Sequence, residues 1–489
     1  MGKRILLLKV ENEDVYNPLG LLYVGSYLKA HGFDVELEIM PVSSFSKANF
    51  SDEKAKTIAA GDYLFVGFSV LTGPQTSFSA LLSKKIKGYS GNTTIVWGGI
   101  HPSLMKEQTL HEDYVDIVVV NEGELTALEL AQALSRGEDI GHVDGIGYKK
   151  DGRAIFNKRR ALIEALDTLP VDWSLVDMDK CIFEVQGRRI KGFIYLTSRG
   201  CPYDCSFCYN RAFNQARWRT HSIGRVIEDI GSLKEKFNIE TVAFMDDHFF
   251  VNKNRSFEIL SRMKEMGVTC AEFLLRVDEI SEESVRVLDS LGVKRIFIGV
   301  ESGNDRVLAL MNKDTTRGMI IEKFRILARH SNIAINCAMI IGYPTETMAE
   351  IEDSIDLGIE LSRMIPGIVV TYQTFLPFPG TDAYELALKE GFRPPERTEG
   401  YEIFDTFGSR LPLSWLPWAD DRTRELFYRI DKYGKLLTHS KSTSIARTIA
   451  KKLFYQLARL RLKYRFFAFP FEIPVLFRFN RYYNPECRI

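Results

Sequence analysis

Residues 199–210 read RGCPYDCSFCYN, and this stretch places Cys201, Cys205 and Cys208 in the spacing C-x3-C-x2-C. Three thiols within eight residues indicate a loop that holds a metal cluster, because cysteine thiolates are the usual ligands of iron–sulfur clusters. Three local ligands would leave one iron of a four-iron cluster without a protein ligand. Since a small molecule could bind at that open iron, the loop predicts a place where chemistry begins.

Two other structures could use the same three cysteines. A zinc site usually needs a fourth Cys or His at close spacing, and the next such residue is His221. A disulfide would leave one of the three thiols unpaired. The spacing therefore favours the cluster, with the three cysteines as its metal ligands and as the catalytic centre.

The composition describes a globular protein with more than one domain. A chain of 489 residues is too long for one ordinary domain, so two or three are expected. The formal net charge is zero, which gives no electrostatic case for a nucleic-acid partner. Seven cysteines, an odd number, argue against a secreted disulfide framework, and neither a signal peptide nor a long apolar run is visible. We expect a cytoplasmic location.

The first 145 residues alternate between buried strands and amphipathic helices. This alternation predicts right-handed crossovers and a Rossmann-like, doubly wound parallel sheet in an α/β protein. The expected strands cover 3–10, 34–40, 63–70, 93–99 and 115–121, and the expected helices cover 17–32, 75–88, 105–114 and 125–137.

Ligands of such sheets bind outside the carboxyl ends of the strands, so the loops at those ends are informative. Each loop alone could be an ordinary tight turn, but four glycine-containing loops on one edge favour a ligand. A dinucleotide is disfavoured because no G-x-G-x-x-G follows the first strand. Besides the loop at 17–20, the candidate binding residues are Thr72, Gly73, Pro74, Gln75, Gly98, Gly99, His101, Ser103, Asn121, Glu122 and Gly123.

Four segments of this region carry a family resemblance: PLGLLYVGSYLKAHGFDVEL, VGFSVLTGPQ, VWGGIHPS and VVVNEGE. They resemble the cobalamin-binding domain that precedes the radical S-adenosylmethionine (SAM) domain in one large subclass of radical SAM enzymes. The D-x-H-x-x-G segment, which supplies a histidine to cobalt in other cobalamin proteins, is missing. The resemblance therefore implies cobalamin bound without a histidine ligand, and we assign His101 to packing or an amide contact.

A second set of strand–helix units follows the cysteine loop. Repeats of about thirty residues predict a full or partial parallel barrel with its active groups at the strand C-termini. Before it, Asp151-Gly152 predicts a hairpin, and a proline-containing stretch predicts a linker. The expected divisions are 1–145 for the cobalamin-binding-like domain, 146–189 for the hairpin and linker, 190–400 for the radical SAM domain and 401–489 for a C-terminal segment.

Polar residues follow the strands of this second region in order. The segments MDDHFF, LLRVD, GVESGNDRVLALMNKDTT and MIIGYPTET resemble the SAM-binding stretches of radical SAM enzymes, and the match extends from about 190 to 390. SAM offers an ammonium, a carboxylate, a ribose and an adenine. The expected partners are Asp246 or Asp247 for the ammonium, Arg276 for the carboxylate, Glu301 and Ser302 for the ribose, and backbone near Phe207 and Gly342 for the adenine.

The resemblance implies a reaction and its cofactors. A 4Fe–4S cluster would reduce SAM to give a 5′-deoxyadenosyl radical, and methylcobalamin would then methylate an unactivated carbon of a small molecule or lipid. An external reductant similar to flavodoxin or ferredoxin would supply the electron. Two alternatives remain: a radical cyclisation or rearrangement without methyl transfer, as in the anaerobic porphyrin-ring cyclases of this subclass, and a non-catalytic iron–sulfur or cobalamin carrier.

The C-terminal segment is aromatic and then basic. Residues 441–489 contain eleven Lys and Arg against two Glu. Apolar residues from Ile445 to Phe467 recur at three- and four-residue steps, which predicts an amphipathic helix with basic residues on its other faces. Such a helix could lie on an anionic membrane, grip an acidic substrate or dock on the barrel. Peripheral membrane contact through 441–489 is therefore one hypothesis.

Overall fold

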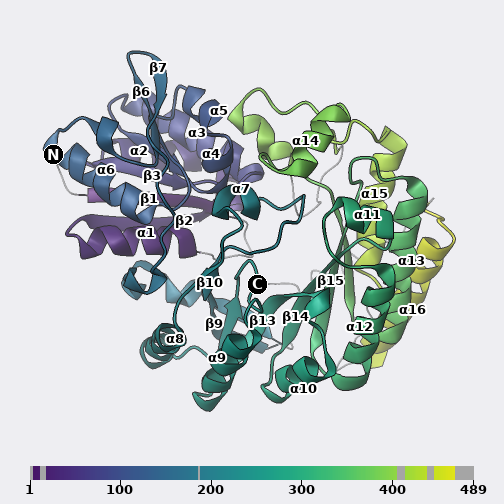
Figure 1. Cartoon of the computed structure of the whole chain (residues 1–489). Coiled ribbons are helices and arrows are strands. Elements are labelled where there is room, and N and C mark those ends of the chain that lie inside the picture. Colours follow the sequence, from purple (N-terminus) through teal and green to yellow (C-terminus); the bar gives the residue numbers. More distant parts are fainter. Residues whose placement is uncertain (1–3, 12–17, 186–187, 405–412, 438–444, 468–489) are drawn as a thin grey trace.

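The computed structural model describes residues 4–11, 18–185, 188–404, 413–437 and 445–467. Two seven-stranded sheets form two lobes, which Figure 1 shows side by side, with the N-terminal lobe in purple and blue and the second lobe in teal and green. The chain crosses between the lobes through the linker and the cysteine loop. The predicted α/β class, with a parallel N-terminal sheet followed by a partial barrel and a C-terminal helical part, is confirmed.

The N-terminal sheet has the strand order β2-β1-β3-β4-β5-β6-β7. Its first five strands are parallel, as the strand–helix alternation predicts. Its core strands are continuous apolar runs because helices cover both faces of the sheet. The strands are β1 (Arg4–Glu11), β2 (Asp34–Pro41), β3 (Phe65–Ser69), β4 (Ile95–Gly98) and β5 (Ile117–Val119), and the helices are α1 (Leu19–Ala30), α2 (Phe50–Ala59), α3 (Pro74–Tyr89), α4 (Ile100–Leu104), α5 (Lys106–His111) and α6 (Glu124–Arg136).

The hairpin predicted at Asp151-Gly152 joins β6 (Ile146–Lys150) to β7 (Arg153–Phe156). Both turn residues have positive φ, 52° and 74°, which is the geometry of a two-residue hairpin turn. The hairpin pairs antiparallel with β5, so it extends the N-terminal sheet.

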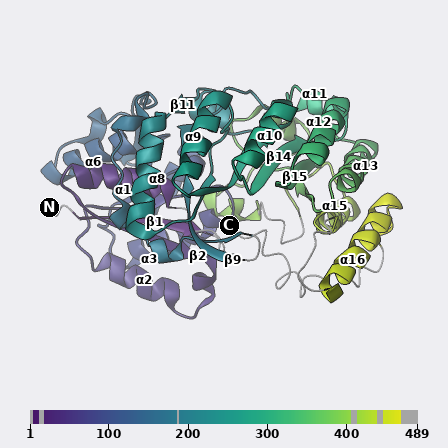
Figure 2. The same cartoon turned by 90° about the horizontal axis from the view of Figure 1, so that it is seen from below.

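The second sheet has the order β16-β15-β14-β13-β12-β9-β8, and all neighbours from β9 to β16 are parallel. Because each parallel pair needs a crossover, helices cover the outer side of the sheet, as Figure 2 shows. The strands are β8 (Ile182–Val185), β9 (Arg188–Tyr195), β12 (Thr241–Phe244), β13 (Thr269–Arg276), β14 (Arg295–Glu301), β15 (Ala334–Ile341) and β16 (Val369–Thr374); the helices are α8 (Ile223–Phe237), α9 (Lys253–Glu265), α10 (Glu282–Ser290), α11 (Asp305–Leu310), α12 (Arg317–His330), α13 (Met348–Met364) and α14 (Asp382–Lys389).

A short antiparallel pair lies between the two lobes. Strand β10 (Ser198–Arg199) pairs with β11 (Arg219–Thr220), and the cysteine loop and helix α7 (Asn210–Asn214) connect them. The cysteine loop therefore begins and ends on a small ribbon at the junction of the two sheets.

The C-terminal part contains helices α15 (Asp421–Gly434) and α16 (Ile445–Lys463), and α16 packs against α13 and α15. Figure 2 shows α16 in yellow at the outer edge of the barrel lobe. The amphipathic helix predicted in this segment is thus present, whereas residues 441–444 and 468–489 lie outside the described residues. No described helix is both long and apolar enough to cross a membrane.

Candidate active site

The cysteine loop is held against the barrel by hydrogen bonds around its middle. The Ser206 amide donates to the carbonyl of Met311 (3.0 Å), and its hydroxyl donates to the carbonyl of Leu310 (2.9 Å). Within the loop, the amide of Cys208 donates to the carbonyl of Cys205 (3.0 Å). These bonds fix the loop backbone while its three cysteines remain free thiols, each only half-buried.

The donor set fits an iron–sulfur cluster better than a single metal ion. Among the described residues, no three His, Cys, Asp or Glu side chains converge closely enough to hold one ion. A cluster does not require such convergence, because each thiolate binds a different iron. Burial raises the pKa of Cys201 to about 11 and that of Cys208 to about 12, so cluster binding must displace protons from these thiols.

The two aspartates after β12 have different surroundings. Asp246 is buried and accepts hydrogen bonds from the amide (3.1 Å) and hydroxyl (2.7 Å) of Thr197 and from the hydroxyl of Ser198. Asp247 accepts from the amide of Gly200 (3.0 Å) and the hydroxyl of Tyr209 (3.4 Å), and it lines the cavity described below. Asp246 thus ties β12 to the end of β9, whereas Asp247 lies beside the cysteine loop with access to the cavity.

Arg276 ends β13 directly beneath the cysteine loop. Its guanidinium donates to both carboxylate oxygens of Asp278 (2.9 and 3.0 Å), lies 3.6 Å from the ring centroid of Tyr203 and places Nη1 4.0 Å from Cys205 Sγ. The side chain is 4% exposed overall, so its positive charge acts at short range on the cluster thiols. This brings one predicted SAM-binding residue next to one predicted cluster ligand.

Glu301 and Ser302 end β14, as predicted, but their side chains are engaged by the protein. Lys313 Nζ donates to Glu301 Oε1 (2.8 Å), and both side chains are almost fully buried. The Ser302 hydroxyl contacts the hydroxyl of Ser354 on α13 (3.2 Å) and accepts from the Asn304 amide (3.1 Å). Their predicted contacts with a ribose stay a prediction.

Gly342 follows β15 and is fixed by side chains on both sides. Its amide donates to Glu346 Oε2 (2.7 Å), and its carbonyl accepts from the indole of Trp418 (3.1 Å). Burial raises the pKa of Glu346 to about 8, against the opposing effect of the amides of Tyr343 and Gly342. Phe207 is half-buried and packs against the barrel core.

A cavity of about 450 Å³ lies where the C-terminal edge of the N-terminal sheet meets the cysteine loop. Its walls are strand ends and helix starts of the N-terminal domain on one side and the junction ribbon, α7 and the end of β12 on the other. From the barrel side it is lined by Leu196, Ser198, Arg199, Tyr209, Phe213, Asn214, Met245 and Asp247.

The predicted loops of the N-terminal sheet divide into two groups. Gly98, Gly99, Asn121, Glu122 and Gly123 line the cavity. From the predicted loop at 17–20, Leu19 and Gly20 also line the cavity, whereas the other predicted residues lie outside the cavity lining and contact protein instead. The hydroxyl of Thr72 contacts Nδ1 of buried His101 (3.2 Å), and His101 packs edge-on against Tyr401. Gln75 is buried beside Gly73 and Pro74 at the start of α3. The Ser103 hydroxyl donates to the carbonyl of Gly99 and accepts from the amide of Asn121.

The cavity suits cobalamin bound without a histidine ligand. No histidine is among its described lining residues, and the glycines at 98 and 99 let a flat ring approach the sheet edge. Burial lowers the pKa of His101 to about 3, and this side chain points into packing with Tyr401. Its assignment to packing rather than to cobalt agrees with this position.

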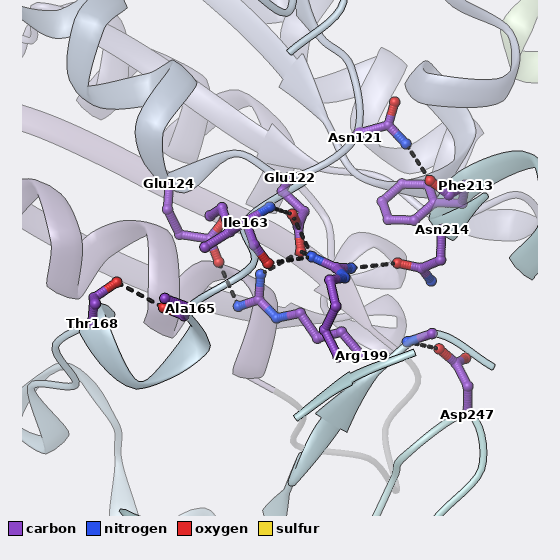
Figure 3. Close-up of polar contacts among 12 residues, drawn as sticks. Asn121, Glu122, Glu124, Ile163, Ala165, Thr168, Arg199, Phe213, Asn214 and Asp247 are labelled. Carbon is purple, nitrogen blue, oxygen red and sulfur yellow. Dashed lines mark hydrogen bonds and ion pairs between the residues drawn. The ribbon is translucent and has the colours of Figure 1, made fainter. Parts of the chain in front are cut away.

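Residues that sequence analysis missed join the two halves of the cavity. Arg199, immediately before Gly200-Cys201, forms ion pairs with Glu122 (2.9 Å) and Glu124 (2.6 Å) of the N-terminal domain (Figure 3). Arg219 pairs with Glu122 as well (2.9 Å). Charged residues on both sides of a predicted domain junction were the signal that could have found them.

A three-cysteine loop at the mouth of a parallel half-barrel, facing a cavity at the edge of a Rossmann-like sheet, defines a two-domain radical enzyme with a second cofactor site. Comparison with known families agrees. The family model described as the radical SAM superfamily matches residues 195–358, and that described as the B12 binding domain matches residues 4–131.

Curated relatives and a solved structure match well over half of this chain. An uncharacterized methyltransferase of Pyrococcus horikoshii is 30% identical over 76% of this chain and 78% of its own length. An anaerobic magnesium-protoporphyrin IX monomethyl ester cyclase of Synechocystis is 27% identical over 65% of this chain and 63% of its own length. The structure of the radical S-adenosylmethionine methyltransferase TsrM from Kitasatospora setae, with cobalamin and a 4Fe–4S cluster bound, has a TM-score of 0.67 at 16% identity, covering 94% of this chain and 99% of that one.

The chain belongs to the family of radical SAM enzymes with an N-terminal cobalamin-binding domain. Its cofactors are accordingly a 4Fe–4S cluster, SAM and cobalamin. The family resemblance seen in the sequence is confirmed. The individual contacts predicted for each cofactor stay predictions.

Proposed function

We propose that this enzyme transfers a methyl group to an unactivated carbon of a small molecule or lipid. The observation that carries the proposal is the cavity shared by the sheet edge and the cysteine loop, because it would bring a corrin beside the cluster. When bound, the cluster supplies an electron that cleaves SAM, and cobalamin supplies the methyl group.

The residues of this chain have definable tasks in that reaction. Cys201, Cys205 and Cys208 would hold the cluster, and Arg276 would stabilise the charge of the cluster and of a nearby carboxylate. Asp247 would receive an ammonium group at the cavity wall, since the oxygens of Asp246 are occupied by Thr197 and Ser198. Together these groups would orient SAM before any bond breaks.

The amounts of two products separate methyl transfer from its main alternative. The Synechocystis relative carries the name of a cyclase, so radical cyclisation without methyl transfer is the second candidate. The test is anaerobic reconstitution with cluster, cobalamin, SAM, a one-electron reductant similar to flavodoxin and candidate substrates. Methyl transfer predicts S-adenosylhomocysteine in step with 5′-deoxyadenosine. Deoxyadenosine with a modified substrate but no S-adenosylhomocysteine would instead establish the cyclase.

We also propose that helix α16 rests on an anionic membrane surface. Leu453 and Leu460 on α16 and Tyr464, directly after its last residue, have 66%, 45% and 66% of their surface exposed. The helix packs on the barrel through Ala458 and Leu462. Several apolar residues of the predicted amphipathic helix are therefore exposed. A helix that only docked on the barrel would bury its apolar residues and expose its basic ones.

The charge near these exposed apolar residues favours anionic lipid as their partner. Lys452 and Lys463 are exposed beside them, and no Asp or Glu occurs between residues 441 and 467. An apolar stripe with flanking basic residues is typical of helices that lie in the membrane interface.

Vesicle sedimentation tests this proposal on the full chain. We expect Leu453→Glu with Tyr464→Glu to lower binding to phosphatidylserine-containing vesicles. The control Leu81→Glu changes an apolar residue of α3 that is 39% exposed, and it should leave binding unchanged. Equal binding by both variants, or equal binding to vesicles of neutral lipid alone, would contradict the proposal.

A further inference from the structure

Two acidic residues at the start of α6 reach across the domain junction to the cysteine loop. Arg199 is the last residue of β10 and stands two positions before Cys201. Its Nη1 lies 2.9 Å from Glu122 Oε1, and its Nη2 lies 2.6 Å from Glu124 Oε1. The side chains of Glu122 and Glu124 are 7% and 4% exposed, so these contacts are shielded from water.

A second arginine completes the group. Arg219 on β11 donates to both oxygens of Glu122 (2.9 Å each) and to the carbonyl of Ile163 in the linker (2.7 Å). The amide of Ile163 in turn donates to Glu122 Oε2 (2.7 Å). Two carboxylates and two guanidiniums therefore join the N-terminal domain, the linker and the junction ribbon in one buried network of balanced charge (Figure 3).

The electrostatics of the network match this geometry. Burial alone would raise the pKa of Glu122, but Arg199 and Arg219 hold it below its usual value. The carboxylate is therefore charged whenever the arginines are in place. Removal of Arg199 would leave Glu122 with Arg219 alone and Glu124 without an ion-pair partner among the described residues. The fold tolerates such a buried, unpaired charge poorly.

Glu124 uses only one of its two carboxylate oxygens in the network. Its Oε1 accepts from Arg199, whereas Oε2 is buried and has no hydrogen-bond partner among the described residues. The same side chain lines the 450 Å³ cavity. A buried carboxylate oxygen without a donor is costly, so this atom favours a ligand that brings an N–H group into the cavity.

We propose that Glu124 and Arg199 are positioning residues that couple cobalamin binding to the position of the cysteine loop. Cobalamin carries carboxamide side chains around its ring, and one of these donates to Glu124 Oε2 while Oε1 holds Arg199. The proposal rests on the cobalamin site of the family but is independent of whether the reaction transfers a methyl group.

Coupling of this kind acts in both directions. If cobalamin stabilises the loop through Glu124 and Arg199, then a loop held in place must bind cobalamin more tightly by the same factor. The expected signature is slower amide hydrogen exchange across residues 199–210 when cobalamin is added.

Hydrogen exchange on the full-length, cluster-loaded protein with and without hydroxocobalamin tests the proposal. In the natural sequence we expect cobalamin to slow exchange both at the N-terminal sheet edge and across 199–210. Glu124→Gln and Arg199→Lys should lose the slowing across 199–210, and Arg199→Lys should retain it at the sheet edge. The control is Glu129→Gln, which changes another α6 glutamate whose partner, Arg160, is remote from the loop.

The variants divide the outcomes clearly. Glu129→Gln should behave as the natural sequence does, and unfolding temperatures of all variants identify any that fail to fold. If Glu124→Gln folds but does not retain cobalt, its hydrogen exchange cannot report on the coupling. Arg199→Lys then tests the coupling, because it leaves both oxygens of Glu124 available to cobalamin. The proposal would be overturned if cobalamin binds to Arg199→Lys and slows amide hydrogen exchange across 199–210 as much as it does in the natural sequence.

Discussion

The two sheets present different surfaces at their carboxyl edges. The N-terminal edge carries Lys9 and the buried network of Glu122 and Glu124, but most of its residues around the cavity of about 450 Å³ are glycines and apolar residues. The barrel strands end in charged residues that are already paired: Arg276 with Asp278, and Glu301 with Lys313. The N-terminal edge thus leaves room for a ligand, whereas the barrel edge holds charged side chains in fixed positions.

The difference indicates how each edge recognises its cofactor. Paired charges are held in place before a ligand arrives, so they can orient a small, charged molecule such as SAM without rearrangement. An edge shaped by glycine accepts a large, flat ring by van der Waals contact and backbone approach. Binding at the barrel edge should therefore be most sensitive to changes of charge or of cluster ligands. Binding at the N-terminal edge should be most sensitive to added side-chain atoms.

The largest expected effect comes from Cys205→Ala. Loss of one of three cluster ligands should reduce iron content and bring 5′-deoxyadenosine formation to background, because residues 199–210 contain no fourth cysteine that could replace Cys205. Cobalt content should fall much less than iron content, since the cavity lining is unchanged and only the contribution of the fixed loop to cobalamin binding is lost. Metal analysis and product chromatography measure these quantities.

Cys337→Ala is the matched control, because Cys337 is fully buried within β15 and takes no part in the loop. It should retain both iron and activity. Retained deoxyadenosine formation in Cys205→Ala, or a parallel loss of cobalt, would contradict the division of tasks between the two edges.

Gly99→Ala should lower cobalamin binding and leave the cluster intact, the reverse of what we expect from Cys205→Ala. Gly99 has φ of 98°, and an added Cβ would lie 3.0 Å from both the amide nitrogen and the carbonyl oxygen of Val70. The strand-to-helix turn at the cavity must then shift, so we expect cobalamin affinity to fall by about tenfold or more, ~1.4 kcal/mol, with iron content unchanged. Gly91→Ala, where an added Cβ meets nothing within 4 Å, should leave affinity unchanged. Equal affinities would show that the turn does not shape the site.

The sequence predicts the architecture well because it depends on local periodicity. Alternating strands and helices predict both sheets, and Asp151-Gly152 predicts its hairpin, since only a few residues decide each element. The loop of three cysteines is also found from the sequence, because its spacing is itself the signal, and the role of the three cysteines as cluster ligands stays a prediction.

Contacts between distant parts of the chain are harder to predict. Glu122 was predicted as a cofactor ligand, but it pairs with Arg199 and Arg219, which are 77 and 97 positions away. Nothing local distinguishes Asp246 from Asp247 either. Only the approach of Thr197 and Ser198 from a neighbouring strand shows which carboxylate is occupied within the protein.

A pH series on Glu346→Gln examines a charge at the barrel edge. Burial raises the pKa of Glu346 from 4.5 to about 8, and Glu350 adds to the shift while Arg306 opposes it. A raised pKa in the folded state means that the neutral acid stabilises the fold below pH 4.5, and that this stabilisation is lost as pH rises through about 8. The amide cannot ionise, so across this window the variant should gain about 5 kcal/mol in the free energy of unfolding relative to the natural sequence, at ~1.4 kcal/mol for each pK unit between 4.5 and about 8.

Urea unfolding at several pH values between these limits measures that difference. The gain should be absent near pH 4.5 and level off above about 8. A stability difference that does not change with pH would mean that Glu346 keeps an ordinary pKa. The charged edge would then include Glu346 as a permanent anion.

The smallest expected effect separates the two aspartates that follow β12. Asp246 accepts three hydrogen bonds from Thr197 and Ser198, so Asp246→Asn would turn an amide N–H group toward donors and should cost about 2 kcal/mol in the free energy of unfolding. In Asp247→Asn the amide oxygen can still accept from Gly200, so unfolding should change by less than about 1 kcal/mol. Asp247→Asn should instead weaken SAM binding, measured by calorimetry on the cluster-loaded protein, because its carboxylate lies beside the cysteine loop, where SAM would bind the open iron. If Asp246→Asn weakened SAM binding with no loss of stability, the ammonium contact would belong to Asp246, and charge at this strand end would serve the ligand before the fold.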